Sequence, residues 1–133
     1  MTRGVLYVQF EGKVYGTIEF NGDMYIKSGS SKGHGIEIVE AFQKMKNWYD
    51  FYLLTEELNK SFQYPEQLIY LLDQEMVERE LNFSKEIYMA DYTYIINLDE
   101  DSTFSFIDKE GRTWELERGE FAVLCFGRLV KLN

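Results

Sequence analysis

The chain has 133 residues, a length typical of one domain that is large enough to bury a hydrophobic core. Hydrophobic residues make up 45% of the sequence, which excludes a disordered polypeptide. The net charge of -9 disfavours direct binding to nucleic acid, because the phosphate backbone would be repelled.

The N-terminal segment predicts an antiparallel meander. Residues 4–10, "GVLYVQF", and 13–20, "KVYGTIEF", are β-branched and aromatic runs separated by Glu11 and Gly12. This is the pattern of a two-residue hairpin, with Gly12 free to adopt a positive φ. Asn21 and Gly22 predict a second tight turn, followed by a short third strand in "MYIK".

The period of the pattern changes after Gly35, where two helices are expected. Apolar residues recur every three to four positions over 35–54, which indicates one face of a helix. That predicted buried face consists of Ile36, Val39, Phe42, Met45 and either Trp48 or Tyr49. A second helix is expected to begin at Pro65, whose fixed φ suits a first helical position. Its predicted buried stripe is Leu68, Leu72 and Met76, with Ile69 beside it, and residues 55–64 would link the helices.

The C-terminal third predicts a second antiparallel meander. Its runs are "YTYIINL" (92–98), "TFSFIDK" (103–109), "RTWELE" (112–117) and "EFAVLCFGRLV" (120–130), with short turn sequences between them. The only cysteine, Cys125, lies in the last run, where burial would make it unreactive. A single thiol suits a reducing environment, and no segment resembles a membrane span or signal peptide. We therefore expect a cytoplasmic protein with no membrane association.

The order of strands, helices and strands predicts an α+β fold. The expected architecture is an antiparallel sheet, or two stacked sheets, from the N- and C-terminal meanders, packed by a central helical pair. No repeat or linker divides the chain, so residues 1–133 are expected to form one domain.

The sequence contains no motif for a metal or cofactor. One histidine and one cysteine cannot make a zinc site, and no carboxylates have calcium-loop spacing. We therefore expect no metal and no cofactor.

The glycine-rich stretch "SGSSKGHG" leads directly into the first predicted helix. Helix N-termini bind anions through oriented N–H groups, so a phosphate-containing ligand is one hypothesis for this loop. The alternative is a flexible joint, because the P-loop spacing is absent. The candidate ligand-binding residues are Ser28, Ser30, Ser31, Lys32 and His34.

Thr2 raises a catalytic alternative. If Met1 were removed, Thr2 would present a hydroxyl and a free α-amine at the start of a strand, as in N-terminal-nucleophile amidohydrolases. The sequence shows no partner for an oxyanion, so the chain is expected not to be an enzyme.

The N-terminal third resembles a family of small uncharacterised proteins of bacteriophages, prophages and bacteria. The matching residues are Thr2 and Arg3, the turn Gly12-Lys13, Asp23 and Tyr25, and Gly33-His34-Gly35 before "IEIVEAF". "ADYTYIINL" is similar to the Tyr-rich strand of that family. The sequence departs from the pattern at Met24, where Gly is usual, at Ile26, where Pro is usual, and in its longer loop. The resemblance implies a phage-associated setting, in which small acidic proteins often inhibit host machinery such as CRISPR and other defence systems.

The surplus of aromatic residues favours a binding function. Two Trp, ten Tyr and ten Phe exceed what the core of such a chain needs, and exposed rings dominate protein interfaces. Together with the phage-associated setting that the resemblance implies, this leads us to expect a non-enzymatic, acidic protein that binds and blocks a host protein with a basic surface in the cytoplasm of a bacterial host cell. The candidate partner-binding residues are Glu56, Glu57, Tyr64, Tyr70, Asp99, Glu100 and Asp101. The sequence leaves self-association open.

Overall fold

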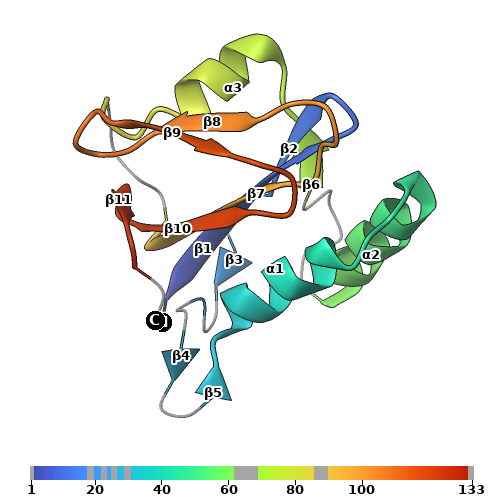
Figure 1. The fold of residues 1–133 in the computed structure, drawn as a ribbon. Helices are drawn as coiled ribbons and strands as arrows, with labels where there is room; N and C mark the ends of the chain where they lie inside the picture. The colour runs from blue at the N-terminus through green and yellow to red at the C-terminus, as the bar shows by residue number, and fades with distance from the viewer. Residues whose placement is uncertain are drawn as a thin grey trace.

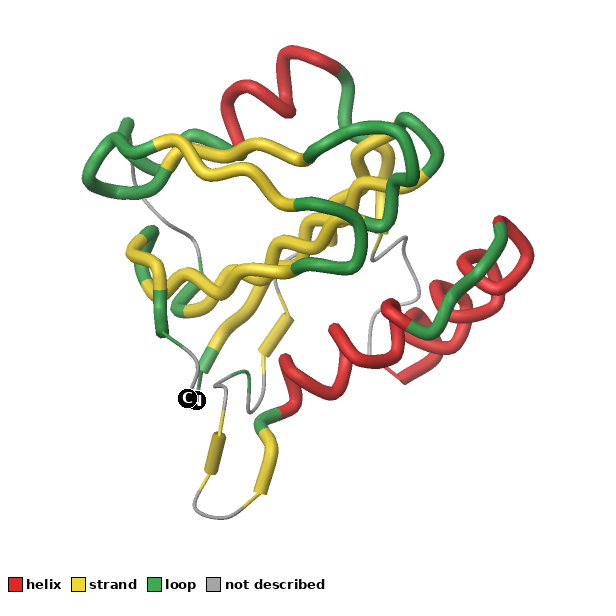
Figure 2. The backbone as a smooth tube through the Cα atoms, in the orientation of Figure 1, coloured by secondary structure: helices red, strands yellow, loops and turns green. Residues whose placement is uncertain are grey.

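The computed structural model describes residues 2–17, 20–21, 24, 27–28, 31–61, 69–85 and 90–131. Within these ranges the chain forms three helices and eleven strands. A large sheet crosses the middle of the molecule, with a hairpin and one helix on one side and two helices on the other (Figure 1). The same layers are visible in the backbone trace of Figure 2. The α+β prediction is confirmed.

The large sheet contains strands from both ends of the sequence. Six of its seven strands lie in the order β11 (Arg128–Leu129), β10 (Phe121–Cys125), β7 (Tyr92–Asn97), β1 (Arg3–Phe10), β2 (Lys13–Thr17) and β6 (Ile69–Leu71). The seventh, β3 (Phe20–Asn21), pairs with the beginning of β1. Strands from both predicted meanders, β1 to β3 from the first and β7, β10 and β11 from the second, therefore share this sheet.

The centre of this sheet is a parallel pair, β1 and β7, in register from Gly4 opposite Tyr92 to Gln9 opposite Asn97. The predicted meanders contained only antiparallel neighbours, and this parallel contact joins one to the other. Both strands are buried along nearly their whole length, because the sheet is covered on both faces. This explains why "GVLYVQF" is an almost continuous apolar run.

The first hairpin is confirmed. Glu11 and Gly12 have φ values of 48° and 74°, and a two-residue turn of this kind needs positive φ at both positions. The third predicted strand is only partly seen: Met24 is not in a strand, Tyr25 and Ile26 are outside the described residues, and Lys27 begins β4 (Lys27–Ser28). β4 pairs with β5 (Ser31–Lys32) in a separate two-stranded sheet.

The C-terminal strands do not follow one another across the sheet. β8 (Phe104–Ile107) and β9 (Thr113–Leu116) pair only with each other as a sheet, and β7 pairs with β10. The predicted strand over 120–130 is divided by a turn at Phe126 and Gly127, both with positive φ. The β8–β9 hairpin does not pair with the large sheet. It covers one face of that sheet instead, as Figure 1 shows.

The first predicted helix is two helices, α1 (His34–Gln43) and α2 (Trp48–Ser61). A cap at Asn47 separates them: its carbonyl accepts from Phe51 N at 3.2 Å and its side chain accepts from Asp50 N at 2.9 Å. The Asp50 carboxylate accepts from Lys46 N at 3.1 Å, so donors on both sides of the helix start are satisfied. α2 also occupies residues 55–61, which were predicted to be a link.

The second predicted helix is largely wrong. Pro65 and Leu68 are outside the described residues, and Ile69 lies in β6, which pairs with β2. The helix there is the short α3 (Gln74–Glu80), whose N-terminal cap is Asp73, with its carboxylate accepting from Met76 N at 2.9 Å. Pairing with the edge of the sheet outweighs the helical spacing of the preceding apolar residues.

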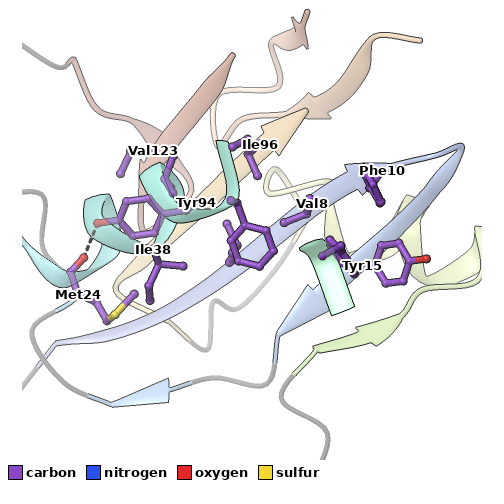
Figure 3. Packing of buried hydrophobic residues seen from close by; sticks show 12 residues of the cluster. Val8, Phe10, Tyr15, Met24, Ile38, Tyr94, Ile96 and Val123 are labelled. Atoms are coloured by element: carbon purple, nitrogen blue, oxygen red, sulfur yellow. Dashed lines mark hydrogen bonds between the residues drawn. The ribbon is translucent and has the colours of Figure 1, made fainter. Parts of the chain in front are cut away.

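Alternating residues of the central strands divide the core between two faces. One face packs against α1 and α2, and its strand residues include Leu6, Val8, Phe10, Tyr15, Tyr94, Ile96 and Val123. The opposite face packs against the β8–β9 hairpin and α3, and includes Val5, Tyr7, Ile95, Ala122 and Leu124 with the hairpin residues Phe104, Phe106 and Leu116. Figure 3 shows the first face, with Ile38 of α1 beside Tyr94. Cys125 is only half-buried, and burial raises the pKa of its thiol.

Candidate protein-binding surface

The outer side of α2 exposes large apolar side chains. Tyr49 is 66% exposed, Tyr52 is 50% exposed and Leu53 is 41% exposed, and Trp48 at the start of the helix is 46% exposed. The same helix buries Phe51 against the sheet. An ordinary surface helix has one apolar face and one polar face, whereas α2 is apolar on both. We call Tyr49, Tyr52 and Leu53 the docking face.

Trp48 and Tyr49 correct a prediction, because one of them was expected on a buried helical face. The cap at Asn47 starts a new helix and changes the direction in which the following residues point. The sequence did contain a signal for this break, since Asn47 followed by Asp50 is a helix-start pattern. A helix start at Asn47 would have predicted that Trp48 and Tyr49 belong to a second helix and do not continue the buried face of the first.

A stack of aromatic rings supports the start of α2. The ring of Trp48 lies 5.4 Å from that of Phe51 at an interplanar angle of 24°, and Phe51 lies 5.1 Å from Phe10 at 11°. Tyr15 of β2 contacts the rings of Trp48 and Phe51 at 5.9 and 4.8 Å. These packed rings fix the orientation of Trp48, part of which remains exposed. A ring that is already fixed loses little conformational entropy when a partner covers it.

The structure brings Glu56 and Glu57 to the same helix as the docking face. Tyr52 Oη donates to Glu56 Oε1 at 2.7 Å, one helical turn away. This hydrogen bond, with the charge of Glu56, raises the pKa of the Tyr52 hydroxyl. Both carboxylates were predicted partner contacts; both lie on α2, and the carboxylate of Glu56 contacts the exposed Tyr52.

The other predicted acids lie in the loop after β7. Asp99 is buried, which corrects its prediction as an exposed tip: its carboxylate accepts from Gly12 N at 2.9 Å and Asp101 N at 3.2 Å, joining two loops. Glu100 is exposed and pairs with Arg118 at 2.9 Å, and Asp101 is exposed. These residues border a pocket of about 260 Å³, with Phe10, Glu11, Gln43, Met45, Lys46, Leu98, Arg118 and Gly119.

Of the two tyrosines predicted to contact a partner, one is half-buried and the other lies outside the described residues. Tyr70 lies in β6 and is half-buried, and burial together with the nearby Glu80 raises its pKa. It packs against the core face that contains the β8–β9 hairpin. Tyr64 lies outside the described residues.

The glycine-rich loop has a structural explanation at Gly35. A Cβ at this position would lie 2.1 Å from Cζ of Tyr94, so only glycine allows the ring to pack against α1. Tyr94 Oη in turn donates to the Met24 carbonyl, as Figure 3 shows. His34 is exposed, with Nδ1 3.8 Å from Glu37 Oε2. Ser28 and Ser31 pair between β4 and β5, Lys32 ends β5, and Ser30 is outside the described residues.

Thr2 uses its hydroxyl within the fold. Its Oγ1 accepts a hydrogen bond from Met24 N at 2.7 Å. Met24 therefore contacts Thr2 through its N–H and Tyr94 through its carbonyl, which links the residue before β1 to β7.

The residues that the structure describes show no cluster suited to a metal ion and no membrane-spanning helix. No group of three or more His, Cys, Asp or Glu residues there is placed to hold a metal ion. No helix of the described chain is long and apolar enough to cross a membrane. No family model, curated protein or solved structure matches the sequence or the fold.

Proposed function

We propose that this chain acts by binding another protein, and that it does so through the docking face of α2 and the acids beside it. The observation that carries the proposal is the exposure of Tyr49, Tyr52 and Leu53 on a helix whose opposite side already fills the core. Tyrosine and tryptophan dominate the binding energy of interfaces because they bury a large area with few rotatable bonds.

The charge of the chain supports a basic partner. The sequence carries 14 Lys and Arg against 23 Asp and Glu, and α2 contributes three acids, Asp50, Glu56 and Glu57, against the single base Lys60. Complementary charge accelerates association and selects among partners. The phage-associated setting implied by the sequence resemblance makes the partner a host protein. Covering its basic surface would block whatever normally occupies that surface, nucleic acid included.

The test is capture of a partner from lysate of the host cell, followed by measurement of association with the purified partner. At ionic strengths rising from about 0.01 to 1 M the Debye length falls from roughly 30 to 3 Å, so a charge-steered association rate should fall steeply. An association rate that does not change over this range would contradict a basic partner. Failure of the folded wild-type protein to retain any partner would contradict the binding function itself.

A further inference from the structure

The spacing of the exposed residues on α2 matches one particular mode of recognition. Tyr49, Tyr52 and Leu53 occupy positions i, i+3 and i+4 of one helix. Helices that insert into an apolar groove of a partner contact it with residues at this spacing. The docking face is therefore shaped for a groove rather than for a flat surface.

The helix is held in position before any partner arrives. Its opposite side buries Phe51, which is 3% exposed and stacks on Phe10 and Trp48. The cap at Asn47 fixes where the helix begins. Because α2 is already folded and oriented, its docking face can enter a groove without the entropy cost of ordering a segment.

The charges on α2 identify the rim of that groove. The ionisable side chains of α2 other than tyrosine are Asp50, Glu56, Glu57 and Lys60, so the helix is acidic on balance, and Glu56 and Glu57 are the ones within about one turn of Leu53. Lys46 precedes α2 and borders the pocket of about 260 Å³ described above. Glu11 and the acidic loop after β7 border the same pocket. Two copies of a chain with net charge -9 would repel each other, which disfavours a second copy as the occupant. A basic rim fits the helix and a second copy does not.

We infer that α2 inserts as a preformed helix into an apolar groove of the partner, and that Arg or Lys side chains on the rim of the groove pair with Glu56 and Glu57. This inference rests on the proposed function and specifies its mode. The docking face fills the groove, and Trp48 covers one end of it.

Site-specific photo-crosslinking tests the mode in the full-length protein. Tyr49→p-benzoylphenylalanine places the cross-linker in the docking face, and Phe126→p-benzoylphenylalanine is the matched control, because Phe126 is 50% exposed on the distant β10–β11 turn. With lysate of the host cell, the first variant should cross-link to a peptide of the partner that borders an apolar groove with Arg or Lys at its rim. The control should give no such product.

Affinity for the purified partner then separates insertion from simple proximity. Tyr49→Ala, Tyr52→Ala and Leu53→Ala should each weaken binding by about 10-fold or more, as expected for interface hot spots, whereas Phe126→Ala should change it by less than about 2-fold. Glu56→Gln with Glu57→Gln should slow association and reduce its dependence on salt. Each variant is first checked for an unchanged circular dichroism spectrum and melting temperature, since all of these positions are exposed or half-exposed.

Three outcomes would overturn the inference. Cross-linking from position 126 but not 49, with alanine variants that bind normally, would reject docking by α2 and leave the binding function standing. A dimer in sedimentation experiments that Tyr52→Ala dissociates would identify a second copy as the occupant. Absence of any captured partner would reject the binding function together with its mode.

Discussion

The two faces of the sheet use aromatic side chains in opposite ways. On the face covered by the β8–β9 hairpin, Phe104 and Phe106 are almost completely buried. On the face covered by α1 and α2, the rings continue from buried Phe10 and Phe51 through half-exposed Trp48 to the solvent-facing docking face. The hairpin side is complete within the chain, and the α2 side leaves apolar surface for a partner.

Polar groups show the same difference. The Asp108 carboxylate, at the end of β8, is fully buried and accepts hydrogen bonds from Arg112 N at 2.9 Å, Arg112 Nε at 3.1 Å and Trp114 Nε1 at 2.7 Å. On α2, by contrast, Glu56 accepts a hydrogen bond from an exposed tyrosine. Buried and satisfied polar groups fix a structure, whereas exposed ones are available for recognition. Substitutions on the hairpin side should therefore change stability, and substitutions on α2 should change binding.

The largest expected difference is between Phe106→Ala and Tyr49→Ala. Phe106 is 1% exposed, so its truncation should lower the free energy of unfolding by about 3–5 kcal/mol through lost burial and a cavity. Tyr49→Ala should change it by less than about 0.5 kcal/mol, because the ring projects into solvent. Urea unfolding of the two variants measures both. A Tyr49→Ala variant as destabilised as Phe106→Ala would show that the docking face belongs to the core.

The next effect is expected at Asp108. Asp108→Asn removes the charge that accepts three hydrogen bonds and should lower the free energy of unfolding by about 2–3 kcal/mol, because hydrogen bonds to charged groups are the strong ones. Asp101→Asn, in an exposed loop, is the matched control and should have little effect. Equal stabilities of the two variants in chemical denaturation would contradict a structural role for the Asp108 charge.

The same residue predicts a dependence on pH. Burial alone would raise the pKa of Asp108, but hydrogen bonds from Trp114 and Arg112 and the charge of Arg112 outweigh it and hold the pKa below 3.8. A carboxyl whose pKa is lower in the folded state stabilises fully above its unfolded pKa, and that stabilisation is lost as the pH falls through the folded value. The stability difference between wild type and Asp108→Asn should therefore be constant at neutral pH and shrink below about pH 3.8. A constant difference down to pH 2 would reject the lowered pKa.

A smaller effect is expected on the α2 side at Gly35. Gly35→Ala places a methyl group against the ring of Tyr94 and should lower the free energy of unfolding by about 1–3 kcal/mol through overpacking. Tyr94→Leu reduces the clash, so the double variant should lose less than the sum of the two single variants. If thermal unfolding shows that the losses of the two single variants simply add in the double variant, the clash with Tyr94 is not the reason for glycine at position 35.

The smallest expected effect is on the titration of Tyr52. Glu56→Gln removes the carboxylate that accepts from Tyr52 Oη, so the pKa of Tyr52 should fall toward its ordinary value of 10.0. Stability should hardly change, because Tyr52 is exposed and Glu56 is only partly buried, so the hydrogen bond competes with water. Absorbance titration of the tyrosines at alkaline pH detects the shift, and Glu57→Gln is the control. An unchanged profile would mean that the hydrogen bond is not maintained in solution.

The sequence predicted those parts of the fold that depend on short-range patterns. Short β-branched and aromatic runs bounded by turn residues located β1, β2 and the C-terminal strands, and the Glu11-Gly12 pair predicted the first hairpin. The parallel contact of β1 with β7 has no local signal, because it depends on which strands the whole chain can bury together. For the same reason, nothing near β8 indicated that the hairpin would leave the sheet and cover it.

The candidate site was predicted only in part. Glu56 and Glu57 were chosen for their charge; both lie on α2 with the exposed rings, and Glu56 contacts Tyr52. Asp99 looked like an exposed turn acid, and its burial depends on Gly12, far away in sequence. The docking face was missed because its rings were assigned to a continuous helix, whereas Asn47 begins a new one.

The parallel pairing of β1 with β7 also determines how the chain can fold. Every residue pair in this contact is 88 positions apart, as for Gln9 and Asn97. Contacts between such distant segments form slowly, because a long loop must close first. During synthesis, the edge of β1 that pairs with β7 would stay unpaired until β7 has left the ribosome. This interval is when the chain is most exposed to aggregation, and a chaperone that covers the edge of β1 would protect it.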